Sequence, residues 1–498
     1  MKKFTELFSA AIILFQIAHC SLFIDNCKAQ WVMQSVPQNY GMVLSIDFVN
    51  SGNGVACGWY NGYGKALYTS NGGITWLPSI VPDSSRSFTA VTFIDSLTGF
   101  MAGAYNLFPA SRSYYSLNRI QGNGYCRSMI EHMGNIGLSR DFDYKGLFVK
   151  TTDGGRSWFT HGILPSRISY LTGIDFIDAS TGVITTSIQD TSVSMNATIL
   201  KTSDGGLSWS EVLNIDSVWE FRSVKFIDND NIIALGWGGS SDSISSNAGG
   251  MIFKSTDQGS NWSLQFFRYN YFTDVSFTDD STIFISANKW GDGLVYKSTN
   301  QGFNWNLIFT QSGNVSLEGI EFFKGSGTGM IFGTYYDLIT YAFARRTTDY
   351  GASWGQLQLL DTTGYNLLYG GIMISRYNQY ITGGNPFGQA AIYHTTNGGI
   401  AGVNLLGNLI PVMYTLSQNY PNPFNPVTNL EFGISDLGFV SLKVYDMLGK
   451  EVMTIVNGKL NPGKYKVEFD GSGLPSGVYF YRLRAGEFME TKCMMFIK

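Results

Sequence analysis

The chain offers few residues whose types and spacing suit catalysis. A site that cleaves glycosides needs two carboxylates about 5–10 Å apart. Four acidic residues fall in segments that read as loops, and no motif pairs any two of them: Glu220, Asp242, Asp292 and Asp337. Histidine occurs only 4 times in 498 residues, and no Ser-His-Asp, zinc-ligand or phosphate-loop pattern is present. We therefore expect no cofactor, no metal site, and binding rather than catalysis.

Aromatic residues are the more prominent candidates for contact with a ligand. They make up 15% of the chain, and charged residues make up only 14%. Trp and Tyr rings present large faces and lose little conformational entropy on binding, so they suit sugars and exposed apolar side chains. The candidate ligand-binding residues are Trp59, Tyr60, Trp219, Trp237, Tyr271, Trp290, Tyr335 and Tyr336. A long insertion between Tyr105 and Tyr144 carries further aromatic and arginine residues.

A second set of acidic residues recurs in a repeated octet. TTDGGRSW, at 151–158, returns with substitutions as TSNGGITW, TSDGGLSW, STDQGSNW, STNQGFNW and TTDYGASW. The octet is either a repeated calcium or catalytic site or a repeated turn. Its hydroxyl and Asp or Asn side chains can bond nearby N–H groups, and its glycine can adopt positive φ. Its tryptophan can wedge between neighbouring units, so we interpret the octet as architecture.

The octets belong to a longer repeat of about fifty residues, a period typical of solenoids, propellers and arrays. Each octet follows a strand-like phrase such as TAVTFIDSLTGFMAG, and each unit reads as four short strands. Seven units predict an all-β fold, a seven-bladed β-propeller, over 30–405. The seventh octet has Gly402 in place of tryptophan. We predict that the segment at Trp31 supplies the missing outer strand and closes the ring.

These octets resemble the Asp-box (BNR) repeat, S/T-x-D-x-G-x-x-W. The full unit most resembles the propellers of photosystem II stability/assembly factors and xyloglucanase-like repeats. Sialidases carry the same box, but the Arg-Ile-Pro motif that precedes their first repeat is absent here. The resemblance implies a fold and says little about function. Three functions stay open: a binding or adhesion module for a glycan or protein, which we prefer, a secreted glycoside hydrolase, and an assembly factor.

After the repeat, the sequence changes character. We expect a linker at 406–413 and a small immunoglobulin-like β-sandwich at 414–498, with turns at Asn457-Gly458 and Pro462-Gly463. This segment resembles the C-terminal sorting domain of type IX secretion substrates, which implies the secretion machinery as a partner. The matching residues include Tyr420, Pro421, Asn422, Pro423, Phe424, Gly449, Gly477 and Lys498.

Residues 1–29 read as a signal peptide, with a basic start at Lys2-Lys3, an apolar run from Leu7 to Ala18 and small residues before the cleavage site. A lipoprotein signal through Cys20 is the alternative, although His19 stands where a small residue is preferred. The net charge of −4 gives no basic face for nucleic acid. We expect a monomer that is secreted, or held on the outer cell surface, after passing through the periplasm.

Overall fold

The computed structural model describes most of the chain as two compact units. The described residues are 31–83, 85–106, 144–165, 168, 170–189, 195–215, 218–239, 249–336, 340–360, 366–385, 389–396, 404–405, 411–436, 438–460, 462–471 and 474–498. The expected signal peptide and the insertion from 107 to 143 lie outside this range. In the part of the chain described, no helix is long and apolar enough to span a membrane.

The first unit, Val32–His394, contains seven four-stranded antiparallel sheets, which we call blades 1 to 7. Blade 1 is β2 (Met42–Phe48), β3 (Gly54–Tyr60), β4 (Tyr63–Thr69) and β5 (Leu77–Pro78). Blade 2 is β6 (Ser85–Phe93), β7 (Gly99–Asn106), β8 (Tyr144–Thr151) and β9 (Phe159–Thr160). Blade 3 is β10 (Tyr170–Phe176), β11 (Gly182–Gln189), β12 (Met195–Thr202) and β13 (Ser210–Ile215). Blade 4 is β14 (Val218–Phe226), β15 (Ile232–Gly238), β16 (Gly249–Ser255) and β17 (Ser263–Arg268).

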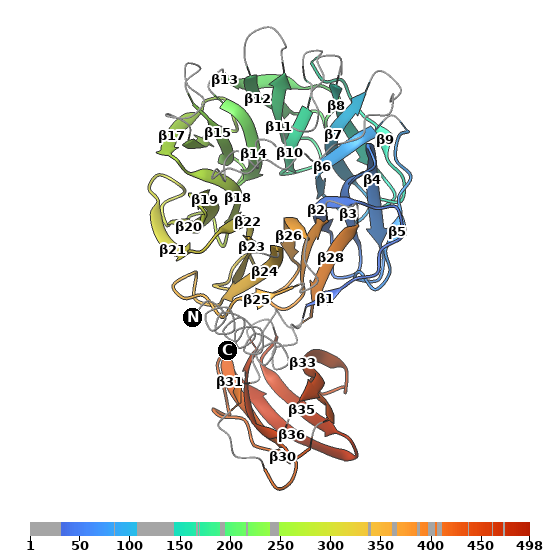
Figure 1. Ribbon diagram of the computed structural model, residues 1–498, viewed down its shortest axis with the longest axis vertical. Coiled ribbons are helices and arrows are strands. Elements are labelled where there is room, and N and C mark those ends of the chain that lie inside the picture. The colour runs from blue at the N-terminus through green and yellow to red at the C-terminus, as the bar shows by residue number, and fades with distance from the viewer. Residues whose placement is uncertain are drawn as a thin grey trace, which may run out of the picture. The chain divides into compact units, whose positions relative to one another are not determined.

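The remaining blades repeat the pattern. Blade 5 is β18 (Tyr271–Phe277), β19 (Ile283–Lys289), β20 (Asp292–Ser298) and β21 (Asn306–Gln311). Blade 6 is β22 (Val315–Phe322), β23 (Gly329–Tyr336), β24 (Thr340–Thr347) and β25 (Gln358–Leu359). Blade 7 combines β26 (Leu367–Met373), β27 (Gln379–Gly384) and β28 (Ala390–Thr395) with β1 (Val32–Met33). The innermost strands β2, β6, β10, β14, β18, β22 and β26 contact one another in a closed ring, so the unit is a seven-bladed β-propeller (Figure 1).

The ring closes by pairing the start of the propeller with its end. In blade 7, β1 is antiparallel to β28, with Val32 opposite His394 and Met33 opposite Tyr393. The backbone N–H of Gln34 continues the ladder to the carbonyl of Ile392 at 2.7 Å. Trp31, directly before this strand, is buried. The prediction that the segment at Trp31 supplies the missing outer strand is confirmed.

The octets form the turns between the third and fourth strands of blades 1 to 6. In blade 2, the N–H of Gly155 donates to Thr151 Oγ1 at 3.0 Å, and the N–H of Ser157 donates to Asp153 Oδ1 at 3.0 Å. Gly155 has φ of +87°, and an added Cβ would lie 2.2 Å from Val55 of blade 1. Trp158 packs with Val55 and other side chains of blade 1, so it lies between blades as predicted.

The second unit includes residues 395–498 and forms two four-stranded sheets around one apolar core. One sheet contains β29 (Asn404–Leu405), β34 (Gly463–Asp470), β31 (Val427–Ile434) and β30 (Thr415–Leu416), and the other contains β33 (Glu451–Leu460), β32 (Gly438–Tyr445), β35 (Gly477–Ala485) and β36 (Phe488–Phe496). This arrangement is the expected β-sandwich.

Two details of the second unit differ from expectation. Asn404–Leu405, which we had assigned to the propeller, pairs with β34 instead. Asn457-Gly458 is not a turn, because both residues pair with β32 inside the long strand β33. Pairing with a neighbouring strand has overridden local turn propensity here.

Candidate functional site

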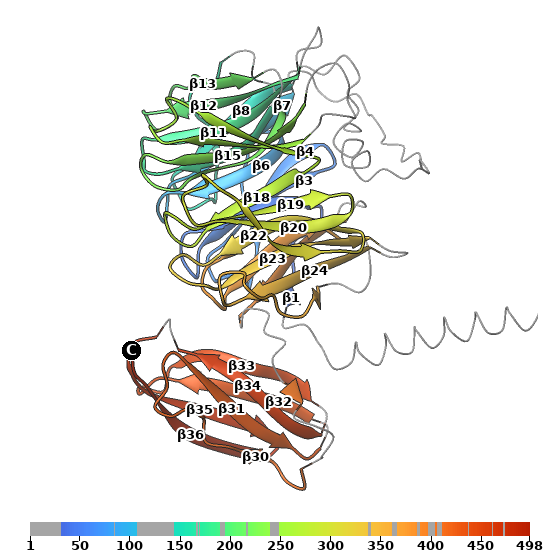
Figure 2. The same ribbon diagram turned by 90° about the vertical axis from the view of Figure 1, so that its left-hand side faces the viewer.

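The two faces of the propeller carry different connections. The octets and the turns between first and second strands lie on one face. The turns between second and third strands and the links between blades lie on the opposite face, which we call the loop face and which is at the right of the ring in Figure 2. All eight candidate aromatic residues lie at strand ends or turns of the loop face.

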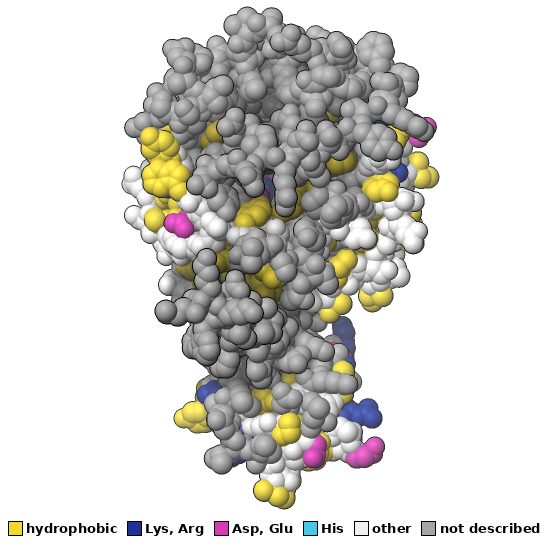
Figure 3. Space-filling view, in the orientation of Figure 1, with side chains coloured by type: hydrophobic (Ala, Val, Ile, Leu, Met, Phe, Trp, Pro, Cys, Tyr) yellow, Lys and Arg dark blue, Asp and Glu magenta, His cyan; other side chains and the backbone are white. Residues whose placement is uncertain are grey.

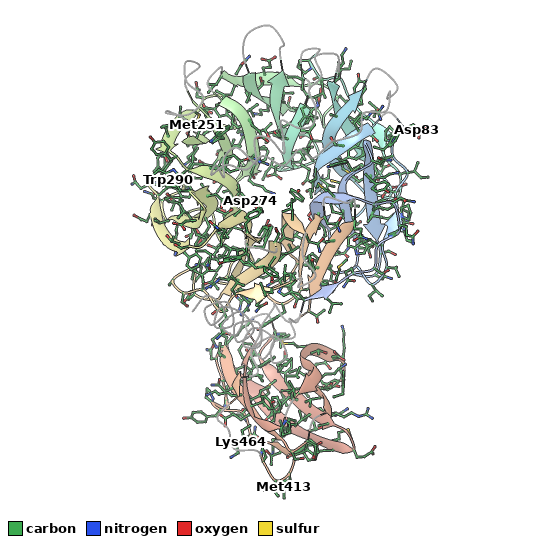
Figure 4. The ribbon with its side chains drawn as sticks, in the orientation of Figure 1. Asp83, Met251, Asp274, Trp290, Met413 and Lys464 are labelled. Atoms are coloured by element: carbon green, nitrogen blue, oxygen red, sulfur yellow. The ribbon has the colours of Figure 1, made fainter. Side chains whose placement is uncertain are left out.

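The structure brings only some of these rings together. Trp237, at the end of β15, packs edge-on against Tyr271 of β18, with ring centroids 5.8 Å apart. Trp290 is 74% exposed and lies at the outer edge of the ring, in the turn after β19 (Figure 4). Four others are half-buried at the ends of second strands: Trp59 and Tyr60 on β3, and Tyr335 and Tyr336 on β23. The side chain of Trp219 lies outside the described residues.

A repeated β-bulge in the innermost strands directs one side chain of each blade differently from its neighbours. The strand register shifts at the same place in all seven blades. The bulged residues are Leu44, Thr89, Thr172, Arg222, Thr273, Glu318 and Tyr369. Bulges commonly re-aim side chains near functional sites. Three bulged residues are large and polar, namely Arg222, Glu318 and Tyr369.

These residues belong to what we call the arginine cluster: Glu220, Arg222, Trp237, Tyr271, Glu318 and Tyr369. Arg222 Nε lies 3.5 Å from Glu220 Oε1 and donates a hydrogen bond to the Tyr271 hydroxyl. The guanidinium also lies 5.1 Å from the centre of the Tyr271 ring. Trp237 is directly opposite Glu220 in the β14–β15 ladder. In the arginine cluster, the aromatic pair of Trp237 and Tyr271 therefore lies against the charged guanidinium of Arg222.

Burial and mutual charge shift the pKa values within the arginine cluster. Burial raises the pKa of both Glu220 and Glu318, and the positive charge of Arg222 opposes the shift. Burial alone would lower the pKa of Arg222, but Glu220, Tyr271 and Glu318 raise it above its ordinary value. Burial also raises the pKa of Tyr369, and Glu318 adds to that effect. Ionisable side chains from blades 4, 5, 6 and 7 thus influence one another's pKa values.

A second group, the lysine cluster, lies on the innermost strands, with four members three residues after the bulge and Asp274 one residue after it. It contains Asp47, Asp175, Lys225 and Glu321, together with Asp274 of β18, which Figure 4 shows at the inner edge of the ring. Asp47 Oδ2 accepts a hydrogen bond from the N–H of Phe93 in blade 2 at 2.7 Å. The carboxylates therefore also link neighbouring blades.

Lys225 controls the charge of this second group. Burial raises the pKa of Asp47 to about 6, and it also raises those of Asp175, Asp274 and Glu321. Lys225 opposes the shift in every case. Burial would lower the pKa of Lys225 itself, but the carboxylates raise it above its ordinary value. One cation thus faces four carboxyl groups.

The acidic residues singled out from sequence have separate locations. Glu220 belongs to the arginine cluster, whereas Asp292 opens β20 at the outer turn beside Trp290. Asp242 and Asp337 lie outside the described residues. Among the residues described, no group of three or more His, Cys, Asp or Glu is arranged to hold a metal ion.

Sequence reasoning missed Arg222, Glu318, Tyr369 and the lysine cluster. For the lysine cluster, the repeated strand-like phrase that precedes each octet contained a usable signal. Asp47, Lys225 and Glu321 each stand between two apolar residues, in Ile-Asp-Phe, Val-Lys-Phe and Ile-Glu-Phe. That position alternates with core residues on the innermost strand, so its side chains leave the face that those residues fill, and Asp47 reaches the neighbouring blade.

The proposed sorting residues divide between core and surface of the second unit. Phe424 is buried and stacks on Phe496 at 5.0 Å, and Asn422 Oδ1 accepts from the N–H of Met495 at 2.9 Å. Tyr420 is exposed. Cis peptide bonds precede Pro421 and Pro423. Gly449 has φ of +77° in the β32–β33 turn, and Gly477 is the first residue of β35. The backbone N–H of Lys498 donates to Ser476 Oγ at 2.9 Å.

Comparison with known proteins identifies the second unit. Residues 418–497 match the family model of the secretion system C-terminal sorting domain. No curated protein matches the chain.

Several solved structures resemble the chain at low identity. The GH74 xyloglucanase from Xanthomonas campestris is 12% identical with a TM-score of 0.45, over 82% of this chain and 60% of that one. The GH74 enzyme from Niastella koreensis is 14% identical with a TM-score of 0.43, over 91% of this chain and 65% of that one. The chain thus spans less than two thirds of either enzyme. The Dos1 propeller is 9% identical with a TM-score of 0.41, over 73% of this chain and 95% of that one.

Proposed function

We propose that this protein, which the type IX secretion system exports to the cell surface or the medium, uses its propeller as a ligand-binding or adhesion module for a glycan or a protein. The ligand contacts the arginine cluster on the loop face. The observation that carries this proposal is the contact of Arg222 with Tyr271, whose ring packs against Trp237.

The cluster combines two properties of a binding site. Its aromatic rings offer apolar area with little loss of entropy, and its guanidinium offers several donors in a fixed plane. Arg222 and Tyr271 lie on the innermost strands β14 and β18, and Trp237 lies on the adjacent strand β15, so little ordering is needed on binding. Rigid scaffolds with irregular loops commonly bind ligands in this way.

Further parts of this proposal rest on sequence resemblance. We take the octets as Asp-box repeats, since they form the same hydrogen-bonded turn in blades 1 to 6. On the resemblance of the whole repeat, we take the propeller as one of the photosystem II assembly-factor type. We also propose a signal peptide at 1–29, a propeller from 30 to about 396 and a monomeric protein.

A glycoside hydrolase is the second candidate, because Glu220 and Glu318 both lie near Arg222. Burial raises the pKa of both carboxyls, and a carboxyl with a raised pKa can act as a general acid. In this alternative the two carboxyls would flank the scissile bond.

The binding module and the hydrolase predict different results for substitutions in the arginine cluster. A binding module loses affinity when Trp237→Ala or Arg222→Thr is introduced, and threonine already occupies the bulge of blades 2, 3 and 5. We expect about tenfold weaker binding on a glycan array or a protein array. Leu44→Met, at the bulge of blade 1, serves as the control. Unchanged binding by both variants would refute the proposed site.

Hydrolysis is measured as release of reducing ends from soluble polysaccharides. We expect none from the wild-type protein. Release that Glu220→Gln or Glu318→Gln abolishes, and that Asp292→Asn at the outer turn leaves intact, would establish the hydrolase instead.

A further inference from the structure

Blades 1 and 5 contain the same two-residue turn with different first residues. Asn61-Gly62 connects β3 to β4 with φ values of +51° and +80°. Trp290-Gly291 connects β19 to β20 with φ values of +52° and +86°. Asn-Gly is the preferred sequence for this hairpin, because both residues need positive φ. A bulky residue at positive φ is strained, so tryptophan is a poor choice for the turn itself.

The tryptophan also gains little from burial. Its side chain is 74% exposed, so it contributes little to the core. Folding therefore explains neither its conformation nor its identity. Residues held in a strained conformation at an exposed position are candidates for function.

A second aromatic residue repeats this pattern beside the first. Tyr269, in the link from β17 to β18, has φ of +64° and is 37% exposed. Its ring lies 5.4 Å from that of Trp290, with 38° between the planes. Lys289 Nζ lies 4.8 Å from the Trp290 ring. Figure 3 shows hydrophobic side chains at this outer edge of the ring. We call Tyr269 and Trp290, with the flanking Lys289 and Asp292, the rim platform.

The chemistry of the rim platform fits a sugar. The C–H groups on one side of a pyranose carry partial positive charge and stack on the negative face of an aromatic ring. Lys289 and Asp292, opposite each other in the ladder, supply a donor and an acceptor for sugar hydroxyls. Two exposed rings are far smaller than a stable protein interface, which buries about 800 Å² per partner. We infer that the rim platform is a glycan-binding site, separate from the arginine cluster and additional to the proposed function.

The test is affinity electrophoresis of the full chain through gels that contain a soluble β-glucan or a soluble α-glucan. We expect retardation by at least one polysaccharide and about tenfold weaker retention for Trp290→Ala. Trp290→Asn should lose retention equally but unfold at a higher temperature than wild type, because asparagine suits the turn. This second variant separates lost binding from lost folding.

Tyr350→Ala provides a matched control on the octet face. Tyr350 also has positive φ (+58°), is 43% exposed and lies under a lysine, with Lys297 Nζ 5.6 Å from its ring. The control should be retained like wild type. Loss of retention in the control as well would show non-specific adhesion and overturn the inference.

Trp237→Ala distinguishes the two proposed sites. Retention that falls with the Trp290 variants and persists with Trp237→Ala supports the rim platform, whatever the fate of the arginine cluster. Retention that falls only with Trp237→Ala overturns the rim platform and leaves the proposed function standing. A wild-type protein that no polysaccharide retards also overturns the rim platform.

Discussion

The carboxylate of Asp47 accepts a hydrogen bond from the backbone N–H of Phe93, which lies 46 residues further along the chain and one blade further around the ring. Asp175 makes the equivalent bond to Phe226 at 2.8 Å, and Ser276 Oγ accepts from Phe322 at 2.9 Å. Side chains of one innermost strand thus satisfy N–H groups of the next. The charge at the axis is therefore part of what holds the blades together.

The lysine cluster predicts an unusual dependence of stability on pH. Its carboxyls have folded pKa values above their unfolded value of about 4, and that of Asp47 is about 6. The folded state then binds more protons than the unfolded state between these values, so this group contributes less stability as pH rises from about 4 to 6. Lys225→Met should enlarge that loss, because it removes the cation that opposes the shift.

We expect Lys225→Met to lower the free energy of unfolding by about 3 kcal/mol at pH 8, and by much less at pH 4. Urea unfolding at the two pH values measures this difference. Lys324→Met, at an exposed site, should change stability by less than about 0.5 kcal/mol. Equal destabilisation by Lys225→Met at both pH values would mean that the carboxyls do not respond to Lys225.

The octet turns predict that asparagine replaces aspartate well and alanine does not. Asp153 accepts hydrogen bonds from the backbone N–H of Ser157 and the hydroxyl of Thr151. Asn71 accepts the equivalent bond in blade 1, where the N–H of Thr75 donates to its Oδ1 at 3.0 Å. Asp153→Ala should cost about 1–2 kcal/mol at neutral pH. Asp153→Asn should cost clearly less, as measured by urea unfolding.

Unfolding at low pH and in the presence of Ca²⁺ tests whether Asp153 stabilises the turn by hydrogen bonding or by binding a cation. Hydrogen bonds hold the pKa of Asp153 below its ordinary value despite partial burial, so its stabilising effect is lost as pH falls below about 4. Asp153→Asn should lack that acid-dependent loss. A rise in melting temperature on adding Ca²⁺ to wild type but not to Asp153→Asn would instead reveal a cation site.

The closing strand predicts a large effect of a small deletion. Removing residues 30–38 eliminates β1 and exposes the edge of β28. Because the deletion also removes the buried Trp31, we expect a loss of about 3 kcal/mol or more, seen as a lower melting temperature. Met33→Lys keeps the backbone pairing at a position that is 53% exposed, and should have little effect. An unchanged melting temperature after the deletion would show that β1 does not stabilise the ring.

Because the propeller and the sorting domain are separate compact units, we expect the propeller to fold without the sorting domain but not to leave the cell. A chain that ends at Thr396 keeps β28 complete and removes the whole sorting domain, including β29. It should fold with the melting temperature of the propeller, yet remain in the periplasm of the native host. Immunoblots of periplasm and medium measure its location. Efficient release of this chain into the medium would contradict a sorting role for the domain.

Local sequence was sufficient to predict the blades but insufficient to predict the bulged residues Arg222 and Glu318. The octet side chains bond within their own turn, as Thr151 and Gly155 do, so a short window contains the whole interaction. The closure could also be predicted, because Gly402 marks a missing strand and Trp31 an extra one. Arg222 and Glu318 could not be recognised in this way. They stand at bulges, where strict alternation fails, and their partners come from other blades.

The pairing of β1 with β28 also has a kinetic consequence. The first strand of the ring to be synthesised pairs with the last, a contact of very high sequence separation, and such contacts slow folding. Until β28 is made, the six earlier blades can form only an open arc, in which blades 1 and 6 expose the apolar faces that blade 7 later covers and β1 has no strand to pair with. Unpaired edges recruit strands from other chains, so we expect this interval, rather than the finished ring, to be when the protein is most prone to aggregate and most dependent on chaperones.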